Sequence, residues 1–228
     1  MTVPFPVANL VGGSGGASGA SITFCATAVD TTDKSAIDTY TFSSHSIGTA
    51  SSDRYIIVAV VLRVFNAGAI SSLTVAGTSC TQAVGATNSG TCYAGIWITN
   101  SPITSGTTAT VAVNFNSGSP LNCGIATFAV TGLQSTTATG TATQTTENTA
   151  TNLSVTAGGV AVALATAAFA QPTYTFTNIT ERFDTTVEAS VNTFGGACDN
   201  QASTQTLSIT IDHSSSGGFD MQCFASFR

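Results

Sequence analysis

The sequence is built from short runs of β-branched and apolar residues, which clusters of Gly, Ser, Asn and Thr separate at intervals of about 8 to 15 residues. We find no sustained apolar spacing of i, i+3, i+4 and i+7, which an amphipathic helix would require. Runs such as 107–115 alternate instead, with Val111, Val113 and Phe115 on one face. The pattern predicts an all-β protein with little helix, an antiparallel β-sandwich of jelly-roll-like character.

Strands are predicted over residues 21–29, 38–43, 54–66, 71–76, 80–85, 92–100, 107–115, 123–130, 137–146, 152–156, 159–166, 173–182, 185–193, 206–211 and 219–227.

The most apolar of these runs carries an arginine at each end. Residues 55–62 are apolar at every position, which favours a central strand that is covered on both faces. Arg54 and Arg63 would then lie about 30 Å apart, at roughly 3.3 Å per residue, and could not act in one small site. The run is also much shorter than the roughly 20 residues of a membrane-spanning helix.

Residues 1–20 differ from the rest and are predicted to form a glycine-rich N-terminal arm, ahead of a single β-sandwich domain over residues 21–228. The stretch 12–16 matches GxSxG but lacks the strand and helix that a nucleophile elbow needs. We expect the arm to dock on a neighbouring protein through its apolar side chains, which are Val3, Phe5, Val7, Leu10 and Val11.

Charged residues make up only 7% of the chain, and the formal net charge is -6. Nucleic-acid binding and binding to an anionic membrane surface are disfavoured, because both require clustered Lys and Arg. The N-terminus has no basic region followed by an uninterrupted apolar region, so no secretory signal is predicted and we expect the protein to be made in a cytoplasm.

The six cysteines contain no CxxC spacing, which argues against a zinc or redox motif. Cys80 and Cys92 are equidistant from Ala86, so a symmetric hairpin would place them opposite each other as a possible disulfide. Cys198 and Cys223 form a second candidate pair. The alternative is that each cysteine is a small buried apolar residue.

Opposite charges cluster at two places, Asp53-Arg54 and the stretch that contains Glu181, Arg182 and Asp184. We interpret these as structural ion pairs that tie loop ends to the rim of the sandwich. The alternatives are a carbohydrate clamp or a pair of catalytic carboxyl groups. Catalysis is disfavoured because Arg182 would lower the pKa of the neighbouring carboxyl groups, whereas a general acid needs a raised one. No catalytic residue is therefore predicted, and the protein is not expected to be an enzyme.

No metal site or cofactor is predicted either. His45 and His213 belong to no HxH or HxxxH array and are expected to be exposed loop residues. Asp30, Asp33 and Asp38 do not have the alternating spacing of a calcium loop, and an ordinary Asx-rich turn is favoured.

Several segments resemble a β-sandwich found in structural proteins of tailed bacteriophages: TYTFSSHSIGTASSDRYIIVAVVLR, SSLTVAG, AGIWITNSPITSGTTATVAVNF and GIATFAVTGL. In that pattern an arginine opens an apolar strand, P-x-x-x-G-x-x-A-T-V forms a later strand, and V-x-G-L ends another. The matching positions are Arg54, Pro102, Gly106, Ala109, Thr110, Val111, Val130, Gly132 and Leu133. With ITERFDTT and CFASFR, the resemblance covers residues 38–228, although the six cysteines are not part of it.

The resemblance implies a non-enzymatic virion protein, which is assembled in the host cytoplasm. We expect a capsid decoration or cement protein that binds the major capsid protein or other virion proteins and forms a homo-oligomer, with a trimer as the first guess. The alternative is a tail-associated fibre or receptor-binding module that recognises a host-surface glycan. Such a site needs exposed aromatic side chains; the candidates are Tyr40, Tyr93 and Tyr174, whereas Tyr55 and Trp97 are expected in the core.

Overall fold

The computed structural model confirms the all-β, antiparallel fold. It describes residues 19–33, 38–65, 70–88, 91–115, 119–167, 173–188, 192–214 and 220–228, which contain β-strands and no helix. The docking-arm residues Val3, Phe5, Val7, Leu10 and Val11 lie outside the described residues.

The strands are β1 (Ser21–Asp30), β2 (Asp38–Ser46), β3 (Tyr55–Phe65), β4 (Ile70–Val75), β5 (Thr78–Asn88), β6 (Cys92–Thr99), β7 (Thr108–Phe115), β8 (Ser119–Thr131), β9 (Gly140–Gln144), β10 (Thr151–Val155), β11 (Gly159–Ala167), β12 (Tyr174–Thr177), β13 (Glu181–Glu188), β14 (Asn192–Gln201), β15 (Gln205–His213) and β16 (Asp220–Phe227).

The first eight strands form one sheet in the order β1-β8-β3-β6-β5-β4-β7-β2. All its pairings are antiparallel, and β5 pairs with β4 near its start and with β6 along the rest of its length. This order is that of a jelly roll, in which β1-β8-β3-β6 forms one layer and β2-β7-β4 folds over it. The jelly-roll character that the sequence pattern predicts is thus present in the first half of the chain.

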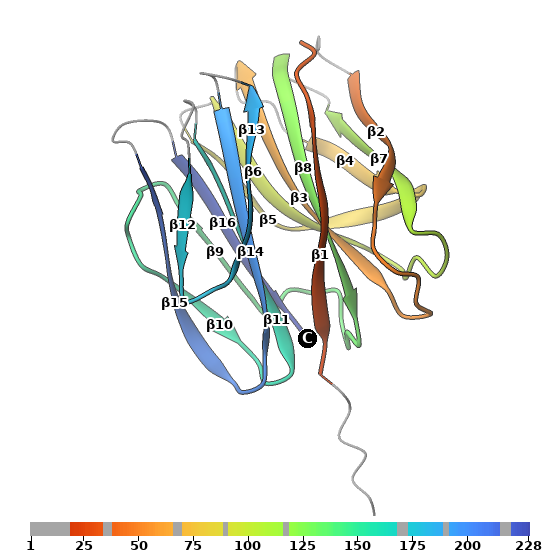
Figure 1. Ribbon diagram of the computed structural model, residues 1–228, viewed down its shortest axis with the longest axis vertical. Helices are drawn as coiled ribbons and strands as arrows, with labels where there is room; N and C mark the ends of the chain where they lie inside the picture. Colours follow the sequence, from red (N-terminus) through yellow and green to blue (C-terminus); the bar gives the residue numbers. More distant parts are fainter. Residues whose placement is uncertain are drawn as a thin grey trace, which may run out of the picture.

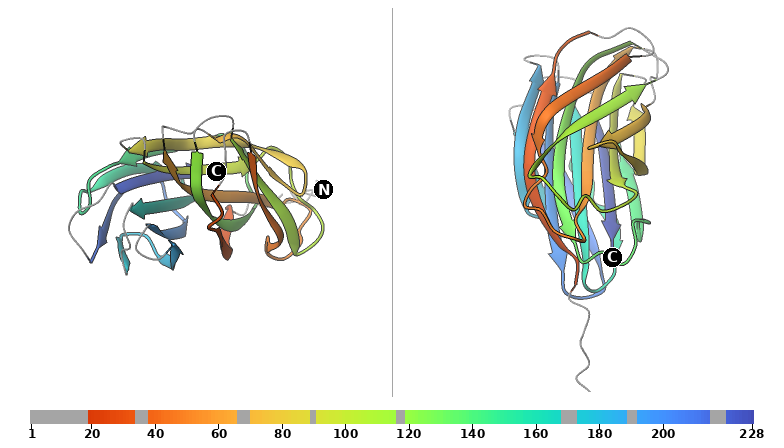
Figure 2. Two further views of the ribbon diagram at one scale, coloured as in Figure 1. Left: turned by 90° about the horizontal axis from the view of Figure 1, so that it is seen from above. Right: turned by 90° about the vertical axis from the view of Figure 1, so that its right-hand side faces the viewer.

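The second eight strands repeat this order. Five of them form the sheet β13-β14-β11-β16-β9, and three form the sheet β10-β15-β12. When eight is added to each strand number of the first half, every neighbouring pair in these two sheets is reproduced, and the β4–β5 pairing is the one that has no counterpart among the described strands. A single sandwich over residues 21–228 was expected, but the strand order shows two jelly rolls in tandem. The two jelly rolls lie side by side in Figure 1. Most strands of both halves run close to the long axis of the molecule (Figure 2).

In the described residues, three hydrophobic cores separate four layers of strands. The central core lies between the β1-β8-β3-β6 layer and the five-stranded sheet, and includes Ile57, Phe128 and Phe194. A second core fills the first jelly roll beneath β2-β7-β4, and a third fills the second jelly roll beneath β10-β15-β12. The two halves thus share a core as apolar as the ones within them.

Strand β3 is covered on both faces, as its unbroken apolar run predicts. Ile57, Ala59 and Val61 belong to the central core, whereas Val58 and Val60 belong to the core of the first jelly roll. Strand β11 occupies the corresponding place in the second half and is also buried along its whole length.

The predicted strands 173–182 and 185–193 do not match the observed strands β12, β13 and β14. The predicted strand 173–182 is interrupted at residues 178–180, where Asn178 has a positive φ of 64°. Strand β14 was not recognised, because its sequence NTFGGACDNQ contains two glycines and several turn-forming residues. The glycines leave room for aromatic rings: a Cβ on Gly195 would lie 2.7 Å from the Tyr174 ring, and one on Gly196 would lie 2.4 Å from the Phe183 ring.

Candidate functional site

Arg54, at the entrance to β3, is fully buried and holds two loops. Its Nη1 donates to the Gly48 carbonyl oxygen at 2.7 Å, on the segment between β2 and β3. Its Nε and Nη2 donate to the carbonyl oxygens of Ile103 and Ser105 at 3.0 and 2.9 Å, on the segment between β6 and β7. A guanidinium suits this arrangement because its donors spread in a fixed plane. Arg54 is therefore a structural tie, as expected, and its partners are loop carbonyls.

Asp53 does not form the expected ion pair with Arg54. Its carboxylate accepts hydrogen bonds from the Ser51 hydroxyl at 2.5 Å and from the Gly132 backbone N–H at 2.8 Å. These hydrogen bonds, led by that of Ser51, lower the pKa of Asp53. The carboxylate thus joins the β2–β3 segment to the end of β8.

In the second charge cluster, Arg182 pairs with a residue that the sequence analysis did not name. Its Nη2 lies 3.6 Å from an Asp199 carboxylate oxygen, and the same atom donates to the Cys198 carbonyl oxygen at 3.0 Å. The Arg182 side chain therefore ties β13 to β14, as expected of a structural residue, but it does not neutralise its sequence neighbours.

The pKa values of Glu181 and Asp184 are raised, whereas lowered values were expected. Partial desolvation, followed for Glu181 by the nearby charge of Asp184, raises the pKa of both carboxyl groups, although both residues are exposed. Because the Arg182 guanidinium is directed to β14, its charge is not the main influence on them. Asp184 also accepts a hydrogen bond from the backbone N–H of Tyr174 at 3.0 Å, so it helps to join β12 to β13.

All six cysteines are free, and the register explains why the proposed disulfides do not form. Cys80 lies opposite Thr99, and Cys92 lies opposite Asn88, because the chain reverses after Asn88 and not at Ala86. Cys198 and Cys223 lie on β14 and β16, which flank β11 on its two sides. The alternative, that cysteines act as small buried residues, fits five of them.

Both histidines are buried, which contradicts the expectation of exposed loop residues. His45 Nε2 lies 3.0 Å from the Thr127 hydroxyl, which itself donates to the Ser46 carbonyl oxygen. The Nε2 atom must therefore carry a hydrogen and donate it to Thr127. Burial lowers the pKa of His45, so the neutral ring is favoured near neutral pH.

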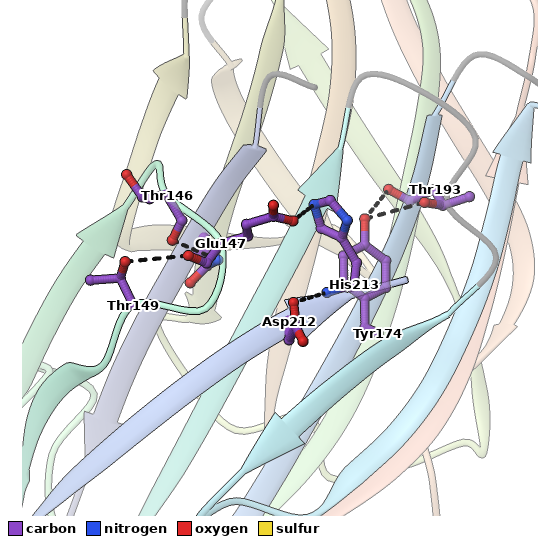
Figure 3. A network of polar contacts seen from close by, with 8 residues as sticks. Thr146, Glu147, Thr149, Tyr174, Thr193, Asp212 and His213 are labelled. Atoms are coloured by element: carbon purple, nitrogen blue, oxygen red, sulfur yellow. Dashed lines mark hydrogen bonds and ion pairs between the residues drawn. The ribbon is translucent and has the colours of Figure 1, made fainter. Parts of the chain in front are cut away.

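His213 lies in a polar network that joins the two sheets of the second jelly roll (Figure 3). Its Nε2 is 3.0 Å from a carboxylate oxygen of Glu147, a residue on the segment between β9 and β10. The Tyr174 ring packs edge-on against the imidazole at a centroid distance of 6.0 Å. The Tyr174 hydroxyl donates a hydrogen bond to the carbonyl oxygen of Thr193 on β14, at 3.1 Å.

The tyrosines that were proposed to bind glycan are buried. Tyr40, Tyr93 and Tyr174 are at most 5% exposed, and Trp97 donates its indole N–H to the Tyr93 hydroxyl at 3.1 Å. Trp97 is buried as expected, whereas Tyr55 is only half-buried. These three tyrosine rings cannot serve as a surface platform for a sugar.

Within the described residues, no group of three or more His, Cys, Asp or Glu side chains could hold a metal ion. Asp30 accepts a hydrogen bond from the Thr32 backbone N–H at 2.9 Å, which is the Asx turn that was favoured over a calcium loop. The described part of the chain also contains no helix long and apolar enough to span a membrane.

No family model, curated protein or solved structure matches this chain.

The Glu147–His213 pair is the candidate functional feature that sequence reasoning missed. Glu147 is a lone acid in the threonine-rich stretch TQTTENTAT, and His213 lies far away in the sequence. The pairing of β10 with β15 and the hydrogen bond from the Asn148 backbone N–H to the Ile211 carbonyl oxygen bring them together. No local spacing could have indicated this contact.

Proposed function

We propose that this chain is a non-enzymatic structural protein of a tailed-phage virion, a decoration or cement protein on the capsid surface. It binds the major capsid protein or another virion protein through its N-terminal arm and sheet edges, and it assembles as a homo-oligomer, with a trimer as the first state to test.

The observation that carries the proposal is that the few charged side chains at the candidate sites have structural roles. The Arg54 guanidinium holds loop carbonyls, Asp53 accepts a backbone N–H, and Arg182 ties two strands together. Such a distribution favours a rigid building block over a protein that turns over a substrate. Arg54 is also the strand-opening arginine of the phage-like pattern.

The outer faces of the stack suit contact with neutral protein surfaces. The β2-β7-β4 face carries a cross-strand row in which the Asn114 side chain accepts from the Thr39 hydroxyl at 2.5 Å and donates to the Ser72 hydroxyl at 3.0 Å. The β10-β15-β12 face exposes Asn152, Ser154, Thr175, Thr177, Thr206 and Ser208. Hydroxyl and amide groups can exchange their hydrogen bonds with water for bonds to a neighbour without the cost of burying a charge.

The alternative, a tail-associated module that recognises glycan, has less support. Its candidate residues Tyr40, Tyr93 and Tyr174 are buried, so binding would have to use other groups. A glycan array run with the purified chain tests this alternative, and tight selective binding would favour it over decoration.

The arm supplies a direct test of docking. A chain that lacks residues 1–18 keeps Ala20, whose N–H donates to the Gly158 carbonyl oxygen at 2.7 Å, so its fold should be retained. We expect the truncated chain to unfold at the same temperature as the full chain but to be lost from particles. Serine substitutions at Phe5 and Leu10 test the same docking contact without removing the arm. Unchanged incorporation of the truncated chain into particles would exclude arm docking.

A further inference from the structure

The tandem fold provides an internal comparison of the two halves at equivalent positions. Strand β7 (TATVAVNF) and the last eight residues of β15 (TLSITIDH) occupy the same place in their jelly rolls and align without a gap. Their buried and exposed positions alternate in step over these eight residues.

A hydrogen bond that occurs in both halves supports this alignment. In the first half the Thr127 hydroxyl on β8 donates to the Ser46 carbonyl oxygen on β2, at 2.7 Å. In the second half the Ser226 hydroxyl on β16 donates to the Ser154 carbonyl oxygen on β10, also at 2.7 Å. Ser46 lies opposite Thr108, the first residue of β7, and Ser154 lies opposite Thr206 on β15.

The alignment places His213 where the first half has Phe115. Phe115 pairs with Ile70 on β4 and packs against the Tyr40 ring at 5.8 Å, within an apolar core. His213 pairs with Tyr174 on β12. The first half thus demonstrates that an apolar aromatic ring is sufficient for the fold at this position, whereas the second half buries a titratable ring.

We propose that the His213–Glu147 pair is a pH-responsive latch, which holds the segment between β9 and β10 against the end of β15. The imidazole lies 3.0 Å from the carboxylate, and the His213 side chain is only 2% exposed. Next to this contact, the Asn148 backbone N–H donates to the Ile211 carbonyl oxygen at 2.9 Å. The pair therefore secures the place where the chain crosses from the five-stranded to the three-stranded sheet.

Several titratable groups of the described residues lie around His213 or next to its neighbours. Glu147 approaches from the β9–β10 segment, and the Tyr174 ring packs edge-on from β12, with its hydroxyl on Thr193. Asp212, on the same strand, accepts the His213 backbone N–H at 2.9 Å. Asp184 of β13 is held by the Tyr174 backbone N–H. Of these acids, Glu147 forms an ion pair with the imidazole, at 3.0 Å.

The sign of the response follows from histidine chemistry. Histidine changes its charge between about pH 5 and 8. In mildly acidic solution the imidazolium and the Glu147 carboxylate attract each other, and the latch is closed. As the pH rises the imidazole becomes neutral, this attraction is lost, and the segment opens more often.

Amide hydrogen exchange at Asn148 in the full chain tests the latch. Each rate is divided by the rate of an unstructured peptide at the same pH, which removes the chemical pH dependence. We expect protection of the Asn148 amide to be about fivefold greater at about pH 5.5 than at about pH 8. Two variants should abolish the difference: Glu147→Gln removes the charge at nearly the same shape, and His213→Phe introduces the residue type of the first half. In each variant the Asn148 amide should be equally protected at the two pH values.

The matched control is His45→Gln, which removes the other buried histidine and should leave the response of Asn148 unchanged. The proposal is overturned if the wild-type protection does not change with pH, or if Glu147→Gln retains the wild-type response. Should His213→Phe fail to fold, the Glu147→Gln comparison still decides the matter.

Discussion

Arg54 is a fully buried cation, and the hydrogen bonds of its guanidinium within the described residues go to the carbonyl oxygens of three loop residues. Arg54→Lys keeps the charge but cannot reach three divergent acceptors, so buried carbonyls lose their partners. We expect the free energy of unfolding to fall by about 2 to 4 kcal/mol, measured by urea denaturation. Arg182→Lys is the control, since that side chain is 38% exposed and should cost less than about 1 kcal/mol. Equal losses in the two variants would contradict the assigned role of Arg54.

His45 predicts a pH dependence of stability at the residue scale. Burial lowers its pKa in the folded state, so on acidification the unfolded chain binds a proton first. The contribution of His45 to stability should therefore be constant above about pH 6.5 and decline below it. Unfolding free energies of the wild type and His45→Gln, measured from neutral to acidic pH, should converge as the pH falls. A difference that stays constant over this range would show that His45 does not titrate as described.

Strand β14 shows, at the scale of an element, where sequence reasoning reaches its limit. Two adjacent glycines normally indicate a turn, but Gly195 and Gly196 lie within a strand because aromatic rings from β12 and β13 pack directly on them. Strands β3 and β11 were predictable because their own residues are apolar throughout. The rings that cover β14 come from other strands, so its sequence alone contains no comparable signal.

The packing of Phe183 on Gly196 predicts the effect of adding a methyl group. In Gly196→Ala the new Cβ would lie 2.4 Å from a Phe183 ring carbon, so the ring must shift. We expect a loss of about 1 to 3 kcal/mol in thermal or urea unfolding. The double variant with Phe183→Leu should lose less than the sum of the two single variants. Simple additivity of the losses would argue against contact between these residues.

The pairing of β5 with β6 was predictable as an antiparallel hairpin, but its register was not. The stretch around Ala86 resembles a turn in composition, yet it continues the strand, and the reversal follows Asn88. Register depends on which residues the opposite sheet covers, and this information lies outside the hairpin. The proposed disulfides depended on the register and for that reason were wrong.

The absence of disulfides and the burial of the cysteines predict how many thiols react in the native protein. Burial raises the pKa of Cys80 and of Cys223 to about 12, and five of the six thiols are buried. In the native protein a thiol-specific reagent should therefore modify only Cys25, which is half-buried, whereas the unfolded protein should react at all six cysteines. A disulfide detected by mass spectrometry of the unreduced protein would contradict this register.

At the scale of the whole molecule, the tandem repeat could not be predicted from the strand pattern. What the two halves share is the order of strands and the alternation of buried positions. The segments GIATF and QCFASF are locally similar, since Thr127 and Ser226 make equivalent hydrogen bonds. Because the halves bury a common core, we expect them to unfold together.

The central claim, that this chain is a structural protein on the surface of a virion head, is tested most directly by cryo-electron microscopy of the particle that carries it. Our account predicts density on the capsid shell that accommodates two packed jelly rolls per chain, with the N-terminal arm directed to the major capsid protein. Density confined to the tail, or intact particles that lack the chain, would contradict it.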